Sequence, residues 1–144
     1  IELDHPGHAL GYRPFAEAQI EALVPLLHRI VQTHDIPRAN VVGHSDVAPA
    51  RKVDPGELFP WARLAEYRLC LPRPTKLEHS DVFDNDAAFY LALERFGYDI
   101  TDGFKAVEAF QRRWRPELID GLICGELRAI LFQLLLDRDR GLTR

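Results

Sequence analysis

The 144-residue sequence predicts an α/β domain with a mixed sheet and packed helices, followed by a small all-α domain of three helices. Three observations lead to this prediction. Short apolar segments at residues 1–3 and 41–42 resemble strands, and an amphipathic helical pattern lies between them. A stretch with closely spaced prolines then interrupts the pattern, and further amphipathic helical segments follow it.

Between the two predicted strands, apolar side chains recur at the spacing of one helical face. They are Ile20, Leu23, Val24, Leu27, Ile30 and Val31. This stripe predicts a helix that packs on the predicted sheet. Pro25 lies inside the pattern and should kink the helix, because proline removes a backbone hydrogen bond.

The segment after the second predicted strand, residues 43–61 (GHSDVAPARKVDPGELFPW), is expected to be a loop that carries chemistry. Its prolines and central glycine disfavour both a helix and a central strand. The loop carries His44, Lys52 and Asp54, and zinc in hydrolytic sites takes imidazole nitrogen and carboxylate oxygen as ligands. On spacing alone, a structural role for these residues would be the better interpretation.

The strings IELDHPGHALGYRPF and GHSDVAPARKVDPGELFPW together resemble the zinc-dependent N-acetylmuramoyl-L-alanine amidases, whose fold is shared with phage lysozyme-type amidases and peptidoglycan recognition proteins. The resemblance covers roughly the first half of the chain. It implies that His44 and Asp54 are two of three zinc ligands. Lys52 would lie beside the scissile carbonyl and stabilise the oxyanion, and Glu2 would act as the general base.

The third zinc ligand of this family is a histidine on a strand upstream of the position that matches Glu2. The resemblance therefore places it before Ile1, and we expect the N-terminal part of the α/β domain to be missing from this chain. Association with that missing segment is expected too. His5 and His8 lie close by, but the resemblance assigns loop residues to their positions, so neither is the favoured substitute.

The composition changes near residues 71–80 (LPRPTKLEHS), where two prolines lie close together and apolar periodicity is absent. Such a stretch is typical of a linker. We therefore predict a linker over residues 73–82, between a domain at residues 1–72 and a domain at residues 83–144.

Amphipathic patterns predict three helices beyond this linker. The first runs from about residue 86 to Phe96, with Gly97 as its C-terminal cap. The second begins near Thr101 or Asp102, either of which can cap it. The expected inward-facing side chains are Leu91 and Phe96 in the first helix, Phe104, Val107, Phe110, Gln111 and Trp114 in the second, and Leu127, Ile130, Leu131, Leu134 and Leu135 in the third.

Two strings in this half, LERFGYDITD and AVEAFQRRWRPELIDG, resemble the peptidoglycan-binding module that is appended to many wall hydrolases. Such a module raises the effective concentration of the catalytic domain at its polymeric substrate. Arg112, Arg113 and Arg115 are expected to be exposed, either to meet wall carboxylates or to form a solvated basic face. Phe110, Trp114 and Tyr98 could be glycan platforms, although the helical spacing of Phe110 and Trp114 favours the core for these two.

Together the two resemblances imply hydrolysis of the amide bond between N-acetylmuramic acid and L-alanine in peptidoglycan or muropeptides. They also imply a location in the periplasm or outer membrane of a Gram-negative bacterium. The alternative is a non-catalytic peptidoglycan-binding protein, or an inactive fragment of such an amidase, because recognition proteins of this fold bind without cutting.

Composition argues against several other classes of protein. The net charge is −4 with interspersed signs, so the sequence predicts no basic surface for nucleic acid. No apolar run approaches the length of a membrane span. Cys70 and Cys124 lack metal-binding or redox spacing, and the sequence leaves open whether they are two buried thiols or a disulfide.

Overall fold

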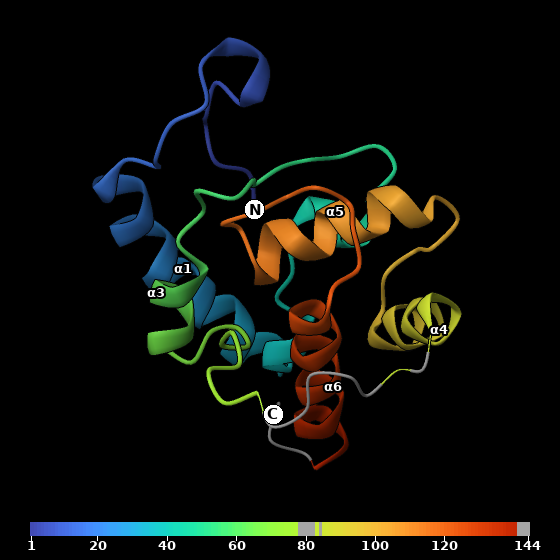
Figure 1. Cartoon of the computed structure of the whole chain (residues 1–144). Helices are drawn as coiled ribbons and strands as arrows, with labels where there is room; N and C mark the ends of the chain where they lie inside the picture. Colours follow the sequence, from blue (N-terminus) through green and yellow to red (C-terminus); the bar gives the residue numbers. More distant parts are fainter. Residues whose placement is uncertain (78–82, 84, 141–144) are drawn as a thin grey trace.

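The computed structural model describes residues 1–77, 83 and 85–140. In the view of Figure 1, α6 stands near the middle, α1 and α3 lie to its left and α4 to its right. The elements, in chain order, are the 3₁₀ helix η1 (His8–Leu10), α1 (Glu17–His34), the 3₁₀ helix η2 (Arg38–Asn40), α2 (His44–Val47), α3 (Trp61–Glu66), α4 (Asp86–Phe96), α5 (Gly103–Trp114) and α6 (Gly125–Asp139).

The predicted mixed sheet is wrong, because the described residues are helical or irregular and contain no β-strand. The backbone at Val41 is extended, with φ −89° and ψ 97°, as the apolar pattern suggested. A strand also needs a neighbour whose peptide groups complete the ladder of hydrogen bonds. No described segment supplies that ladder, and the carbonyl of Val41 instead accepts a hydrogen bond from Nη2 of Arg113 at 3.3 Å.

The helix predicted from the first apolar stripe is confirmed as α1, which continues through Pro25. Pro25 lies on the exposed side of the helix, as does Glu21, whose carbonyl loses its helical partner to the proline. Water can therefore bond to that carbonyl, which limits the cost of the interruption.

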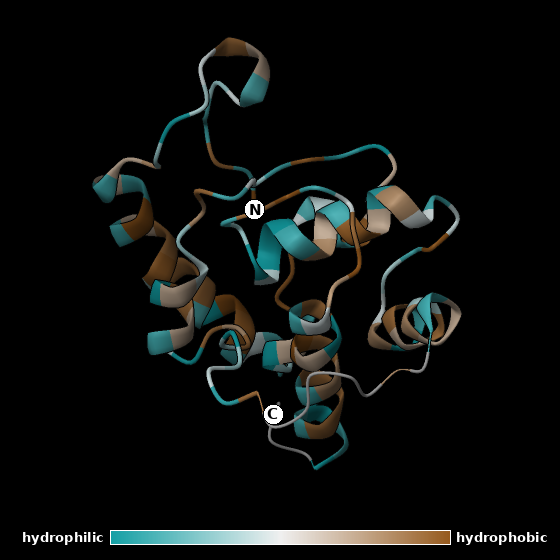
Figure 2. Ribbon diagram, in the orientation of Figure 1, coloured by the Kyte–Doolittle hydropathy of each residue, from teal (hydrophilic) through white to brown (hydrophobic). Residues whose placement is uncertain are grey.

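The inner side of α1 belongs to a group of buried apolar residues that we call the N-terminal cluster. Leu3 and Val41, from the two segments predicted as strands, pack against this cluster at its edge. Figure 2 shows the hydrophobic stretches of α1 and α6. The members of the N-terminal cluster are Ile20, Leu23, Leu27, Phe59, Leu64, Leu69 and Cys70.

The helices of the second half lie where the sequence predicts them. Asn85 caps α4 by accepting a hydrogen bond from the Ala88 amide at 3.0 Å, and the helix ends before Gly97, whose φ is 127°. Asp102 caps α5 through the Lys105 amide at 3.1 Å. Local capping chemistry therefore determines where these helices begin.

A second buried group, the C-terminal cluster, joins α4, α5 and α6, and α4 packs directly on α6. Two side chains predicted to face inward do not, because Leu91 is 65% exposed and Phe104 is 49% exposed. Phe104 instead lies against the backbone of Gly121, where an added Cβ would be 2.2 Å from its ring. The fully buried members of the C-terminal cluster include Phe89, Leu93, Ala106, Val107, Ala109, Phe110, Leu127, Ile130 and Leu131.

The predicted linker over residues 73–82 lies partly outside the described residues, from residue 78 to residue 82. At its start, Arg73 forms ion pairs with Glu117 at 2.6 Å and with Glu126 at 3.2 Å. Leu71, just before it, is buried in the C-terminal cluster. The chain therefore already packs against the C-terminal cluster at Leu71, before the predicted linker begins. The division into two domains stays a prediction.

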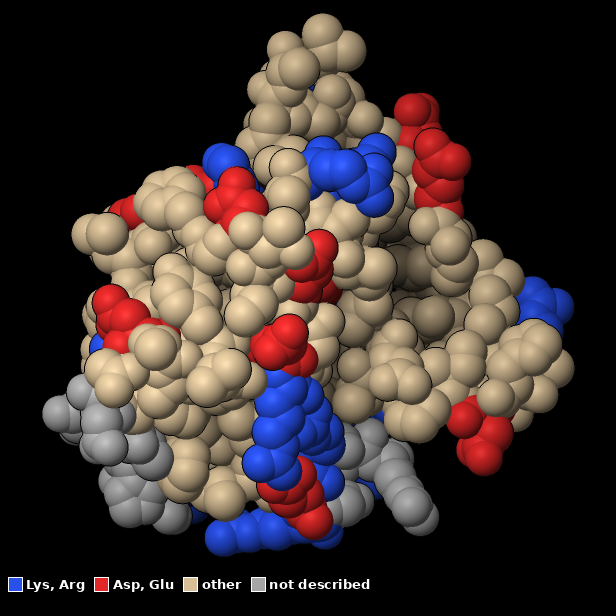
Figure 3. All heavy atoms as spheres, turned by 90° about the vertical axis from the view of Figure 1, so that its right-hand side faces the viewer, with Lys and Arg blue, Asp and Glu red and all other residues tan. Residues whose placement is uncertain are grey.

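The expectation of exposed arginines at the end of α5 is wrong. Arg113 and Arg115 are only 8% and 6% exposed, and the side chain of Arg112 is 12% exposed. Their long side chains turn toward acidic partners on loops: Arg115 lies 3.5 Å from Asp120, and Arg112 lies 3.8 Å from Glu57. Charges of opposite sign also lie beside one another on the face shown in Figure 3.

Arg113 connects the two clusters. Its guanidinium lies over the ring of Trp61, 3.3 Å from the ring centroid, and over Trp114 at 4.9 Å. Nη1 of the same side chain lies 3.4 Å from a carboxylate oxygen of Asp46. The two halves therefore meet through a buried ion pair and a cation–π contact.

The two cysteines are free thiols, so the alternative of a disulfide between Cys70 and Cys124 is not realised. Cys124 is exposed, whereas Cys70 is buried and donates to the carbonyl of Trp61 at 3.5 Å. Burial raises the pKa of the Cys70 thiol, which favours its protonated form. None of the described helices is both long enough and apolar enough to cross a membrane.

Replacement of Arg113 by methionine should lower the free energy of unfolding by about 3 kcal/mol, because it leaves the buried Asp46 carboxylate without its cation. Urea denaturation measures this loss. The matched control is Arg95→Met, which breaks an exposed ion pair with Asp139 and should cost less than about 1 kcal/mol. Equal losses in the two variants would contradict a structural role for the buried pair.

Candidate active site

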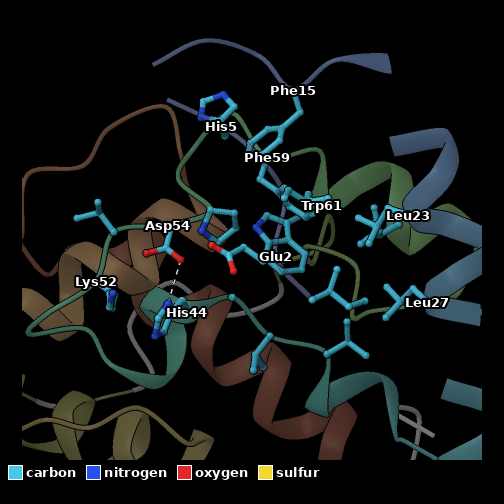
Figure 4. A pocket seen from close by; sticks show the side chains of 18 of the residues that line it. Glu2, His5, Phe15, Leu23, Leu27, His44, Lys52, Asp54, Phe59 and Trp61 are labelled. Atoms are coloured by element: carbon cyan, nitrogen blue, oxygen red, sulfur yellow. Dashed lines mark hydrogen bonds and ion pairs between the residues drawn. The ribbon is translucent and has the colours of Figure 1, made fainter. Parts of the chain in front are cut away.

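A pocket of about 980 Å³ opens between the start of the chain, α1 and the segment from residue 40 to residue 64. The four side chains predicted to carry the chemistry, Glu2, His44, Lys52 and Asp54, all line it (Figure 4). The structure therefore brings together residues that lie up to 52 positions apart in the chain. Their catalytic and ligand roles remain predictions.

His44 and Asp54 form the polar centre of this pocket. Nδ1 of His44 donates a hydrogen bond to Oδ2 of Asp54 at 3.0 Å, and the two side chains are 49% and 60% exposed. The backbone supports this pairing, because the Ser45 amide donates to the Asp54 carbonyl at 2.9 Å. Both side chains are thus held together and remain open to a ligand.

His44 is the first residue of the one-turn helix α2, so the expectation of a loop without helix in the ten residues after His44 is wrong at the start of that stretch. Pro49 follows the end of this turn at Val47 and so does not interrupt it. Gly43 precedes the turn at a crowded position, where a Cβ would lie 2.7 Å from Cδ of Pro55. Only glycine fits there without a shift of the loop.

Glu2 and Lys52 bring an anionic and a cationic group to the same pocket. Glu2 is exposed and Lys52 is half-buried. Neither side chain forms a hydrogen bond or an ion pair with any residue that the structure describes. Both groups are therefore available to a ligand that enters the pocket.

The opposite end of the pocket is apolar. Leu23 and Leu27 of α1 lie there, together with Phe59 and Trp61 of the loop, and Figure 4 shows the two leucines on the side away from Lys52. A molecule that fills the pocket would meet charged groups at one end and hydrocarbon at the other.

The buried side chain of Asp46, a residue of α2, bonds this turn to its surroundings. Oδ2 of Asp46 accepts a hydrogen bond from the Gly43 amide at 2.7 Å, and Oδ1 accepts one from the Tyr98 hydroxyl at 2.6 Å. Burial, and then the negative charge of Asp46, raise the pKa of Tyr98 well above its usual value. The hydroxyl of Tyr98 therefore stays protonated and donates to the carboxylate.

Tyr12 ties the start of the chain to the loop that follows Asp54. Its hydroxyl donates to the Pro55 carbonyl at 2.9 Å and accepts from the Leu58 amide at 2.9 Å. The ring of His8 stacks on Tyr12, with centroids 4.0 Å apart. Sequence reasoning missed this contact, because no local pattern reports a bond between residues 43 positions apart.

His5 and His8 line the pocket but have other partners. Nε2 of His5 donates to the Arg13 carbonyl at 2.8 Å, and its Nδ1 accepts from the Gly7 amide at 3.1 Å. Nε2 of His8 lies 3.0 Å from a carboxylate oxygen of Glu57. Both imidazole rings thus have hydrogen-bond partners, and the expectation that neither histidine replaces the missing metal ligand stays a prediction.

The His44 and Asp54 pair suits two positions of a zinc site. Two ligand atoms of a tetrahedral zinc ion lie about 3.3 Å apart, since each bond is roughly 2.0 to 2.1 Å long. The observed separation of 3.0 Å is close to that value. The described residues contain no group of three or more His, Cys, Asp or Glu side chains that could hold a metal ion.

Gly56 tests the Tyr12 contact. Its φ is +85°, and an added Cβ would lie 2.1 Å from the Tyr12 hydroxyl. Gly56→Ala should therefore lower the free energy of unfolding by about 2 to 4 kcal/mol, through backbone strain and overpacking. The control Gly11→Ala has a similar φ of +95° but no atom within 4 Å, so it should cost only about 1 kcal/mol. Thermal or urea denaturation compares them, and similar losses would argue against close packing at Gly56.

Comparison with known proteins finds a family match and several relatives. Residues 1–57 match the family model described as N-acetylmuramoyl-L-alanine amidase. The N-acetylmuramoyl-L-alanine amidase AmiD of Escherichia coli is 36% identical over 155 residues, covering 94% of this chain and 55% of AmiD. The 1,6-anhydro-N-acetylmuramyl-L-alanine amidase AmpD of Enterobacter cloacae is 42% identical over 50 residues, covering 35% of this chain and 27% of AmpD.

Solved structures agree with the sequence comparison. The complex of Escherichia coli AmiD with the substrate anhydro-N-acetylmuramic acid-L-Ala-D-gamma-Glu-L-Lys has a TM-score of 0.81 at 34% identity, covering 88% of this chain and 55% of that one. AmpDh3 of Pseudomonas aeruginosa has a TM-score of 0.79 at 31% identity, covering 90% of this chain and 56% of that one. The chain thus spans about half the length of AmiD. What the comparisons show is therefore a match of residues 1–57 to the N-acetylmuramoyl-L-alanine amidase family model, and a similarity of the longer chain to about half of AmiD.

Proposed function

We propose that this chain is part of a zinc-dependent amidase that hydrolyses the bond between N-acetylmuramic acid and L-alanine in peptidoglycan or muropeptides. The observation that carries the proposal is the bonded His44 and Asp54 pair, in a pocket that also contains Glu2 and Lys52. The family match over residues 1–57 supports it. So do the relatives AmiD and AmpDh3, whose structures are known in complex with an anhydromuramic peptide.

His44, through Nδ1, and Asp54, through Oδ2, would hold the metal ion. Zinc in such a site polarises a carbonyl group and lowers the pKa of a bound water. Protons would compete with the metal for the imidazole of His44 and the carboxylate of Asp54, because metal ligands must be deprotonated. Metal affinity should therefore fall as the pH decreases.

Glu2 and Lys52 would carry the remaining chemistry. The carboxylate of Glu2 would accept a proton from the attacking water and deliver it to the amine of L-alanine as the carbon–nitrogen bond breaks. The ammonium of Lys52 would stabilise the oxyanion that forms on the carbonyl oxygen. The products are the lactyl carboxylic acid and a free peptide amine, so the atoms of one water are divided between them.

The second half, residues 83–144, would bind peptidoglycan and concentrate the chain at the wall. Its large aromatic residues Tyr98, Phe110 and Trp114 are buried, so they cannot be the glycan-stacking surface of such a module. A polymeric wall substrate would place the protein in the periplasm or at the outer membrane of a Gram-negative cell. In the alternative function, the second half binds the wall and the pocket catalyses no hydrolysis.

Incubation of the full-length protein that contains this chain with muropeptides should release free stem peptide, detected by mass spectrometry, and a zinc chelator should abolish this release. Pull-down with insoluble peptidoglycan provides the second measurement. Wall binding without peptide release would support the non-catalytic alternative. Release that persists after complete removal of metal would argue against the zinc chemistry.

Lys52→Met should lower kcat by about two to three orders of magnitude, because it removes an oxyanion donor. The matched control is Lys76→Met, at an exposed lysine outside the pocket, which should leave kcat unchanged. Single-turnover assays on a defined muropeptide provide the comparison. An active Lys52→Met protein would remove this lysine from the mechanism.

A further inference from the structure

We infer that Tyr98 and Arg113, both in the second half of the chain, are positioning residues for His44, and that they act through the buried carboxylate of Asp46. The inference rests on the proposed function only in taking His44 as a metal ligand. It gives the second half a task beyond attachment to the wall, namely support of the catalytic loop.

Asp46 is the point where the two halves meet. It is buried, and its oxygens contact the Gly43 amide at 2.7 Å, the Tyr98 hydroxyl at 2.6 Å and Nη1 of Arg113 at 3.4 Å. The first contact belongs to the loop that carries the site. The other two come from the segment just after α4 and from α5, more than 50 residues along the chain.

The contact with Gly43 determines where His44 lies. Gly43 is the residue directly before His44, and its bond to Asp46 closes the single turn of α2. A helix of four residues is not stable alone, because the entropy lost in fixing the first turn exceeds the free energy gained from its hydrogen bond. The direction of the His44 side chain therefore depends on contacts from outside α2, and α2 packs directly on α5.

Arg113 holds the same loop a second time. Its Nη2 donates to the Val41 carbonyl at 3.3 Å, while its guanidinium covers the ring of Trp61. Val41 lies before His44 in the chain and Asp46 lies after it. One buried side chain thus contacts the chain on both sides of the proposed ligand, at the Val41 carbonyl and at the Asp46 carboxylate.

The chemistry of this contact favours positioning over stability alone. Replacing a buried ion pair by apolar side chains of similar volume is often neutral or stabilising, so such a pair is weak evidence of a purely stabilising role. Directional bonds to a loop do what apolar packing does not, because they specify one backbone geometry. Residues behind metal ligands commonly tune affinity in this way.

Tyr98→Phe is the sharpest test, because it removes one hydroxyl and keeps the ring that packs against Phe110. In metal-free protein, amide hydrogen exchange at Gly43 should become about 10-fold faster, since local opening of α2 becomes easier. Zinc affinity, measured by competition with a chromophoric chelator, should weaken about 3- to 10-fold, below the usual effect of a partner bonded directly to a ligand. In the assay on muropeptides, kcat should fall while KM stays unchanged.

Two controls separate positioning from a general loss of stability. Tyr90→Phe removes a hydroxyl that has no hydrogen-bond partner among the described residues and should change none of the three measurements. Val107→Ala opens a cavity at a fully buried site in α5 that makes no hydrogen bond to Asp46. This substitution should lower the melting temperature without lowering the affinity for zinc.

The outcomes are distinct. If wild-type protein binds zinc and Tyr98→Phe matches Tyr90→Phe in both exchange and zinc affinity, the inference is wrong. The inference is also wrong if Val107→Ala and Tyr98→Phe lose the same stability and lower the affinity for zinc by the same factor. If the full-length wild-type protein neither binds zinc nor releases peptide, the proposed function fails, and amide exchange at Gly43 alone decides whether Tyr98 holds the loop.

Discussion

The buried carboxylate of Asp46 is the constraint on which the arrangement of this molecule depends. A charge removed from water must be paired and hydrogen-bonded, or the fold loses several kcal/mol. Asp46 finds its partners in Gly43, Tyr98 and Arg113, which belong to three separate parts of the chain. These partners can be satisfied together only when the two apolar clusters lie in one relative position, so this contact sets the geometry of the junction.

The pocket gains its properties from the same short turn. His44 and Asp46 are two residues apart in α2, and a helical turn directs such residues to different sides. His44 faces the pocket and is exposed, whereas Asp46 faces the interior and is buried. The groups that would meet a ligand are therefore open to solvent, while the groups that hold them are shielded from it.

Local signals explain what the sequence predicted well. Asn85 and Asp102 mark the starts of α4 and α5 through their caps, and apolar periodicity identified the buried face of α6. The prediction of a mixed sheet was wrong because a strand needs a partner strand, and a local sequence pattern does not show whether one is present. The prediction of exposed arginines was wrong for a related reason, since the acidic partner of Arg113 lies 67 residues away in the chain.

The candidate site was predicted from the family resemblance more than from physical spacing. His44 and Asp54 lie ten positions apart, a separation that carries little information alone, and Glu2 has no local feature that marks it. The structure places all four predicted residues in one pocket, and the family match over residues 1–57 confirms the resemblance there. Tyr12 and Tyr98 were not predicted as parts of the site, because their bonds to the loop connect distant segments.

The packing of α2 on α5 also limits how this architecture can be rearranged. Two modules joined only by a tether can be recombined freely, because neither depends on the surface of the other. Here a replacement module would need a tyrosine and an arginine at matching places, or it would leave Asp46 buried without partners. Domain shuffling is therefore restricted at this junction, and functional chimaeras require donors that reproduce both side chains.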